Sequence, residues 1–321
     1  MEPIVLPTPF PVGPVNAWLL VGDPLTLVDS GPNTPEALAA LEAGLAGHGL
    51  RIEDIELLIL THQHSDHVGL AATVHARSGC RVAGHELLAG YVADVEAALA
   101  AEAEWEERLL LFHGTPAERC EEFLAITRDR RRYGGAGAAL DLPLADGDVV
   151  EAGGLRLRVA FRPGHSPTDT LFVDDATGTA LAGDHLIAHI SSNPLVHRPP
   201  LGPADPATRP SSVNAYLDSL ARTADEDLTL LNTGHGASIT DYRPLIAERI
   251  RLHHRRADQV HAALGDGVRS ASELSRVLWP DVPPNQTFLT LCEVLGAFDL
   301  LEQEGRAVRS RRGETLVYER A

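Results

Sequence analysis

The segment Thr61-His62-Gln63-His64-Ser65-Asp66-His67 decides the fold, because it gathers three imidazoles and a carboxylate directly after an apolar run. Imidazole nitrogen and carboxylate oxygen together suit zinc, iron or manganese better than magnesium or calcium. The preceding Leu57-Leu58-Ile59-Leu60 predicts a buried strand, and a helix is expected from about Val68. A polar turn at a helix start would explain Ser65 and Asp66 as caps, but it gives no reason for three histidines. Because open α/β sheets place their sites beyond strand ends, we expect a metal site in this loop.

Three later segments repeat one design, in which an apolar strand is followed by a glycine and a ligand-type residue. They are Arg156 to Phe161 before Pro163-Gly164-His165-Ser166, Ala180-Leu181-Ala182 before Gly183-Asp184-His185, and Leu228 to Leu231 before Thr233-Gly234-His235-Gly236. Upstream, the strand-like Leu25 to Val28 runs into Asp29-Ser30-Gly31. Glycine lets the chain turn sharply at a strand end, so the neighbouring side chains can point into one shared cleft.

Five strand-end motifs in this order resemble the metallo-β-lactamase superfamily, and its glyoxalase II-like hydrolases more than its antibiotic-destroying branch. The resemblance covers about residues 10 to 240 and implies an α/β fold, a four-layer αββα sandwich. It also implies a set of metal ligands: His62, His64 and His165 for one ion, Asp66, His67 and His235 for a second, and Asp184 as a bridge between them. Asp29 is implied to be an outer carboxylate that orients the His/Asp loop.

The resemblance implies two divalent transition-metal ions as cofactors, zinc in the first place, with iron or manganese as alternatives. The implied nucleophile is a hydroxide bridging the two ions, with Asp184 and Asp66 as the catalytic carboxylates and Asp66 orienting the attacking group. Ser166 is predicted to be a turn residue instead of a nucleophile, because it lacks a Gly-x-Ser-x-Gly elbow.

The chain is predicted to divide into a catalytic domain at residues 1–246 and a second domain at residues 247–321. A helical insertion at about 85–140 contains helices expected over Val92 to Leu111 and Pro116 to Arg132. It is either a solvated helical hairpin, with a possible homodimer contact, or a lid over the metal cleft. Its candidate substrate contacts are Tyr133, His113, Arg128, Arg130, Arg131 and Arg132.

The segment from His185 to Pro210 has no regular period and begins at the expected bridging ligand, so we expect it to line the site. His185 and His189 are predicted to be outer partners of the metal ligands or substrate-binding groups. The alternative is that both merely pack beside the metals.

Beyond residue 242 the sequence predicts three helices and a hairpin, an order that resembles a winged-helix module. The helices are expected over Tyr242 to Leu264, with arginine and histidine on the exposed face, from Ser270 through Leu278, and over Pro284 to Leu301; the hairpin is expected at Arg306 to Arg311 and Thr315 to Glu319. The third helix contains no basic residue, so a structural or dimerising role is favoured over DNA binding.

Composition adds limits on partners and location. The chain has 321 residues, 44% hydrophobic content and a formal charge of −18, with arginine as its only basic type besides histidine. This negative charge disfavours nonspecific binding to nucleic acid or to an anionic membrane. No signal sequence is visible at Met1-Glu2-Pro3, and a cytoplasmic location is expected. Cys80, Cys120 and Cys292 are expected to be buried and without disulfides.

Two function classes remain, a hydrolase of small thioesters, esters or lactones and a nuclease or phosphodiesterase of the same superfamily. The acidic composition favours the first. A β-lactamase is disfavoured by Asp184, because that branch usually lacks a bridging carboxylate there. Hydroxyacylglutathione is disfavoured by the missing C-terminal Asn-Pro-Phe segment. Lactonase activity is weakened by Ile187, where lactonases that resemble this site carry tyrosine.

Overall fold

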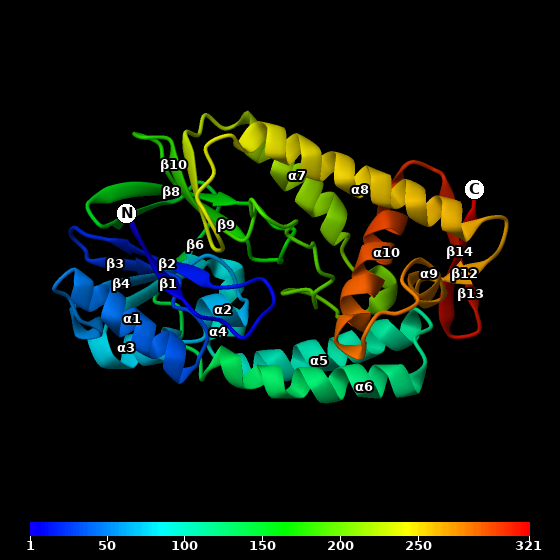
Figure 1. Ribbon diagram of the computed structural model, residues 1–321, viewed down its shortest axis with the longest axis horizontal. Helices are drawn as coiled ribbons and strands as arrows, with labels where there is room; N and C mark the ends of the chain where they lie inside the picture. Colours follow the sequence, from blue (N-terminus) through cyan, green and yellow to red (C-terminus); the bar gives the residue numbers. More distant parts are fainter.

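The computed structural model describes residues 1–321, apart from the side chain of Arg130. A pair of stacked β-sheets occupies the half of the molecule on the left of Figure 1, with strand orders β1-β2-β3-β4-β5-β6 and β11-β10-β9-β8-β7. The first sheet consists of β1 (Glu2–Leu6), β2 (Val15–Leu20), β3 (Thr26–Val28), β4 (Leu57–Leu60), β5 (Arg81–His85) and β6 (Leu142–Leu144). The second consists of β7 (Val149–Ala152), β8 (Leu155–Phe161), β9 (Thr170–Asp174), β10 (Thr179–Gly183) and β11 (Leu230–Thr233).

Helices cover the outer face of each sheet and complete four layers. α1 (Pro35–Gly47) and α3 (Ala71–Ser78) share a core with the first sheet, while α7 (Ser212–Asp225) and the start of α8 (Tyr242–Leu264) share one with the second. A third core lies between the sheets and contains Ile59, whereas its neighbour Leu58 belongs to the core under α1. β4 is therefore buried on both faces, which explains its unbroken apolar run. The predicted αββα sandwich is confirmed.

The loops that carry the sequence motifs follow strands whose ends lie close together. β3, β4 and β5 are parallel, as are β10 and β11. α2 (Ser65–Val68) begins earlier than expected, with His64 at its N-cap, so Asp66 and His67 lie on its first turn. All the segments predicted as motif-bearing strands contain strands in the structure.

The insertion forms two antiparallel helices preceded by short turns. Its elements are η2 (Glu86–Leu88), α4 (Ala89–Val92), α5 (Val95–Phe112), α6 (Ala117–Arg128) and η3 (Asp129–Gly134). α5 starts at Val95 instead of Val92, because Asp94 caps it and accepts a hydrogen bond from the backbone of Ala97. The second helix stops at Arg128, after which the chain tightens into η3.

The C-terminal segment has the predicted order of helices and hairpin. Beyond α8 it contains β12 (Arg269–Ser270), α9 (Ala271–Leu278), η5 (Pro284–Gln286), α10 (Thr287–Gln303), β13 (Ala307–Arg312) and β14 (Thr315–Arg320). Two further short turns, η1 (Ile52–Asp54) and η4 (Pro206–Thr208), lie earlier in the chain. Ser270 caps α9 as expected. The expectation that α8 exposes its arginine and histidine is wrong at Arg249 and His253, which are buried.

Arg249 is buried because it has backbone partners. Its Nη2 donates hydrogen bonds to the carbonyl oxygens of Ile187, Ala188 and Ile190, at 3.2, 3.2 and 3.0 Å. Three acceptors offset the cost of removing the guanidinium from water. α8 thereby anchors the loop that follows Asp184.

One hydrophobic core joins the insertion to the C-terminal segment. It includes Trp105 and Leu109 of α5, Phe123 of α6, Leu295 and Phe298 of α10, and Tyr318 of β14. α5 and α6 accordingly lie across one end of α10 (Figure 1). The insertion therefore packs against the end of the chain, instead of standing alone as a solvated hairpin.

The cysteines and the lengths of the helices can be described from the structure directly. Cys80, Cys120 and Cys292 are buried and unpaired, as predicted. In the part of the chain that the structure describes, every helix is too short or too polar to cross a bilayer.

Candidate metal centre

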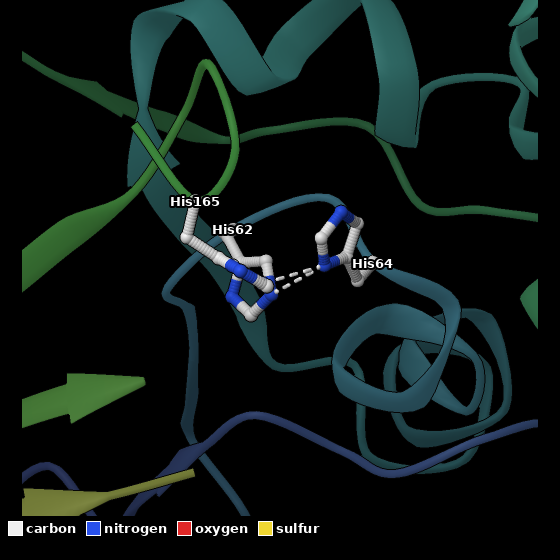
Figure 2. A group of neighbouring side chains, drawn as sticks. All are labelled: His62, His64 and His165. Carbon is white, nitrogen blue, oxygen red and sulfur yellow. Dashed lines mark hydrogen bonds between the residues drawn. The ribbon is translucent and has the colours of Figure 1, made fainter. Parts of the chain in front are cut away.

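Three histidine rings converge where the loop after β4 meets the loop after β8 (Figure 2). His64 Nδ1 lies 3.1 Å from His62 Nε2 and 3.0 Å from His165 Nε2. Ligand atoms about 2.0–2.1 Å from a tetrahedral zinc ion stand about 3.3 Å apart. The spacing of these three nitrogens is therefore close to that of a tetrahedral metal site.

A second group of ligand atoms lies beside the first. Asp66, His67 and His235 offer atoms within 4.8 Å of one another. Asp184 lies between the groups: its Oδ1 is 3.3 Å from His67 Nε2, and its Oδ2 is 3.4 Å from His235 Nε2 and 3.7 Å from His165 Nε2. This is the position that a bridging carboxylate requires.

Outer partners fix which nitrogen of each ring faces the centre. Nδ1 of His62, His67, His165 and His235 contacts Thr61 Oγ1, Asp29 Oδ2, Asn193 O and Pro14 O, at 3.0, 2.7, 3.1 and 2.8 Å respectively. Carbonyl and carboxylate oxygens can only accept, so at His67, His165 and His235 the proton is on Nδ1. The Nε2 lone pair of each of these rings is then free to bind a cation.

Asp29 holds both the His/Asp loop and one of its rings. Its Oδ1 accepts from Thr61 N at 2.9 Å, and its Oδ2 accepts from Thr61 Oγ1 at 2.8 Å as well as from His67. The residue adopts φ of +60°, a conformation uncommon for residues other than glycine. The structure thus gives Asp29 the contacts expected of the residue that orients this loop.

His64 is oriented the opposite way, through a pair of residues that the sequence analysis missed. Its Nε2 contacts His197 Nε2 at 3.1 Å, and His197 Nδ1 contacts Glu102 Oε1 at 3.0 Å. Since the carboxylate accepts from His197 Nδ1, His197 Nε2 is left to accept from His64. Glu102 and His197 therefore keep the Nδ1 lone pair of His64 directed at the other two histidines.

Two glycines allow this crowding. A Cβ on Gly234 would overlap Asp184 Oδ1, and a Cβ on Gly183 would press on Thr61. Gly183 also has φ of +48°. The glycines before Asp184 and before His235 are thus required because the ligand loops approach one another closely.

The histidines of the two groups differ in charge. Burial lowers the pKa of His62 and of His64 well below the ordinary value, and lowers the pKa of His165 to about 4, so these rings are neutral at pH 7. Burial acts in the same direction on His235, but the carboxylates of Asp184 and Asp66 raise its pKa to about 9. A cation that binds in the second group must therefore displace the proton that His235 carries at pH 7.

Unpartnered buried atoms indicate that the cluster fits metal. Among the described residues, His67 Nε2, His235 Nε2 and Asp184 Oδ1 are buried without a hydrogen-bond partner. Leaving a buried polar atom unpaired costs about 1–3 kcal/mol. The three residues belong to the groups of candidate metal ligands, where divalent cations would satisfy these atoms.

The structure separates the other candidate residues from the cluster. His185 is buried and directs Nε2 to Thr223 Oγ1 at 2.9 Å, and His189 is exposed beside Gly236. Tyr133 lines a neighbouring hollow and packs edge-on against Phe10, at 5.5 Å between ring centroids. The prediction that His113 contacts substrate is wrong, because it is buried and stacked parallel to Tyr318 in the core shared with the tail.

The arginines near the end of the insertion also differ in place. Arg131 lines the large cavity beside the cluster, Arg132 donates to Tyr133 Oη at 2.9 Å, and Arg128 is exposed. The side chain of Arg130 lies outside the described residues. Ser166 donates through both N and Oγ to Asp169, which agrees with its prediction as a turn residue.

The fold and the cluster together define the class of protein. Residues 10–235 match the model of the metallo-beta-lactamase superfamily, and the chain belongs to that superfamily. The chain is 32% identical, over 98% of its length and 96% of the relative, to the probable metallo-hydrolase YqjP of Bacillus subtilis (strain 168). The His/Asp cluster is thus the candidate site for divalent metal ions in this chain.

Solved structures and further relatives agree on this fold. A metallo-beta-lactamase family protein from Thermus thermophilus gives a TM-score of 0.82 at 33% identity, covering 100% of this chain and 98% of that one. A beta-lactamase domain protein from Burkholderia ambifaria shares the fold, with a TM-score of 0.81 at 24% identity over 99% and 92% of the two chains. The hydroxyacylglutathione hydrolase of Rhodopseudomonas palustris (strain BisA53) is 28% identical over 54% of this chain and 49% of its own length, about half of each.

Replacing His197 with leucine should weaken metal retention by about 10–100-fold, the usual cost of removing an outer partner of a metal ligand. The reason is that His64 Nε2 would lose its acceptor and the ring would be free to turn. Chelator competition followed by metal analysis measures the effect. His48→Leu, at an exposed histidine just after α1, is the matched control; equal retention in both variants would show that His197 does not orient His64.

Proposed function

We propose that this chain is a binuclear metal-dependent hydrolase that acts on small thioesters, activated esters or lactones. The observation that carries the proposal is the placing of Asp184 between two groups of ligand atoms, with a large cavity opening against His64 and Asp66. Divalent ions held there, with zinc proposed first and iron or manganese as alternatives, would lower the pKa of water toward about 7 and polarise the carbonyl under attack.

The chain's own residues then have distinct tasks. The histidines present lone pairs, and Asp184 supplies the bridging charge. Asp66, whose Oδ2 lies 3.3 Å from His235 Nε2, lines the cavity and can accept a hydrogen bond from the attacking group. The buried Ser166 is occupied by Asp169, so a serine nucleophile is not part of the proposal.

The leaving group distinguishes thioesters from amides. His197 uses one ring nitrogen on His64 and the other on Glu102, so it has no proton to give a departing amine. A thiolate leaves without protonation, since its conjugate thiol has a pKa of about 8.5, whereas an amine needs an acid. This favours thioesters and activated esters over amides and β-lactams.

A small-molecule substrate is also favoured over nucleic acid. α10, the counterpart of a recognition helix, is buried along most of its length. The formal charge of −18 opposes a general attraction to phosphates.

Thioester and activated-ester hydrolysis should exceed amide or β-lactam hydrolysis by about 10²–10⁴-fold in kcat/KM, the contribution typical of a general acid. The rate should rise with pH through about 7 and disappear when the metals are removed. A panel of thioesters, esters, lactones, a phosphodiester and a β-lactam measures this before chelation, after it and after reloading. Turnover that survives demonstrated metal loss, or a phosphodiester rate above every ester, would reject the proposal.

A further inference from the structure

A cavity of about 810 Å³ begins at the His/Asp cluster and extends away from it. Its inner end is formed by His64, Ser65 and Asp66. Its walls come from α5 and α6 on one side and from α8 and α10 on the other, elements that Figure 1 shows around the middle of the molecule. The volume is within the about 300–1,000 Å³ typical of small-molecule sites.

Apolar side chains from separate segments, most of them large, line this cavity, which we call the acyl pocket. They include Leu99 and Ala103 of α5, Phe123 of α6, Ile190, Leu252 of α8 and Leu289 of α10. Leu252 and Leu289 are only half-buried, and neither is part of the hydrophobic cores. Ile190 is 37% exposed. Aliphatic surface left open to solvent inside a concave site favours an apolar ligand.

Charged groups around the acyl pocket are largely engaged with one another. Glu102 holds His197 and the backbone of Arg198, while Arg256 pairs with Glu293 at 3.2 Å and lies over the ring of Trp279. Burial raises the pKa of Glu293 above its ordinary value, which is consistent with a pocket of low polarity. A phosphate or carboxylate entering here would face the carboxylates of Asp66, Glu102, Glu106 and Glu293. These outnumber the two arginines of the lining, Arg131 and Arg256, and Arg256 is already paired with Glu293.

We propose that the acyl pocket holds the uncharged hydrocarbon chain of the acyl group in the substrate. The proposal rests on the proposed ester and thioester hydrolysis and adds the class of acyl group: medium to long, apolar and without an anionic end. The scissile carbonyl would lie at the His64 and Asp66 end, and the chain would extend between α5 and α10. Burying a methylene group changes a binding constant by about fourfold, equivalent to about 0.8 kcal/mol.

The test separates binding from turnover by using probes that cannot be hydrolysed. Butyl, octyl and dodecyl methyl ketones are titrated into the metal-loaded protein by calorimetry. The Kd should fall by up to about fourfold per added methylene until the pocket is full. Ala103→Trp fills the pocket and should remove the gain from butyl to dodecyl; Ala97→Trp, on the exposed side of the same helix, should keep it.

Leu252→Gln and Leu289→Gln provide a second route if Ala103→Trp does not fold. Both positions are half-buried, and each change should reduce the affinity for the dodecyl probe by about tenfold or more, because one apolar contact is replaced by a polar group. A Kd independent of chain length, or dodecyl binding that is unchanged in the pocket variants, overturns the proposal. If ketones bind as expected but no ester is hydrolysed, the proposed function fails and the pocket assignment stands; if esters are hydrolysed without chain-length dependence, only the pocket assignment fails.

Discussion

Asp184→Ala should reduce the metal content from about two ions per chain to less than one, whereas His62→Ala should remove only one. The reason is that the Asp184 carboxylate approaches His67, His165 and His235, and so belongs to both ligand groups. In the variant, the pKa of His235 should also fall, because the Asp184 carboxylate is the main group that raises it. kcat/KM should fall by more than about 10–100-fold, which is the usual effect of removing an outer partner of a metal ligand.

Elemental analysis of protein purified without chelator measures this, with kcat/KM on a thioester as a second readout. Asp281→Ala, at an exposed carboxylate, is the matched control and should retain the full metal content. An Asp184→Ala protein that keeps two ions, or an active protein that holds only one, would contradict the binuclear assignment.

Phe298→Ala should lower the free energy of unfolding by about 3–5 kcal/mol, the usual cost of emptying a buried phenylalanine site. Phe298 is fully buried in the core shared by α5, α6 and α10, and its ring is stacked on Tyr318 with centroids 3.7 Å apart. Val277→Ala, at an exposed position on α9, should change stability by no more than about 0.5 kcal/mol.

Denaturant unfolding gives the two free energies, and hydrogen exchange identifies the affected elements. Because Trp105 and Leu109 belong to the same core as Phe298, protection should also fall in α5. If α5 keeps its protection while only α9, α10 and the hairpin open, the tail is an independent unit and the shared core contributes little.

The strand-end motifs predicted the sandwich and the candidate ligand set through the family that they resemble, and the ligands meet because their loops follow strands whose ends lie close together. His62, His165 and Asp184 stand beyond β4, β8 and β10, so the positions of the strand ends nearly determine theirs. The resemblance implied that Asp29 orients the His/Asp loop, and the structure adds that it does so through Thr61 and His67, because β3 and β4 are parallel neighbours.

Residues in irregular segments were harder to predict. His197 and Glu102 are distant in sequence and meet only because the loop after β10 runs against α5. The one signal in the sequence for His197 was the expectation that this loop lines the site. Arg249 was expected at the surface because arginine usually is, and its burial depends on three loop carbonyls. The core joining α5 to α10 required long-range packing that local periodicity does not encode.

The candidate ligands all precede residue 236, whereas much of the cavity wall comes from the insertion and the tail. If the ligand set and the acyl pocket are as proposed, reactivity and selectivity are encoded in different stretches of the chain, and wall positions can vary without altering the ligand set. Glu102 is the exception. It stands in the wall while holding His197 against His64, so a substitution there would change substrate preference and metal retention in a single step.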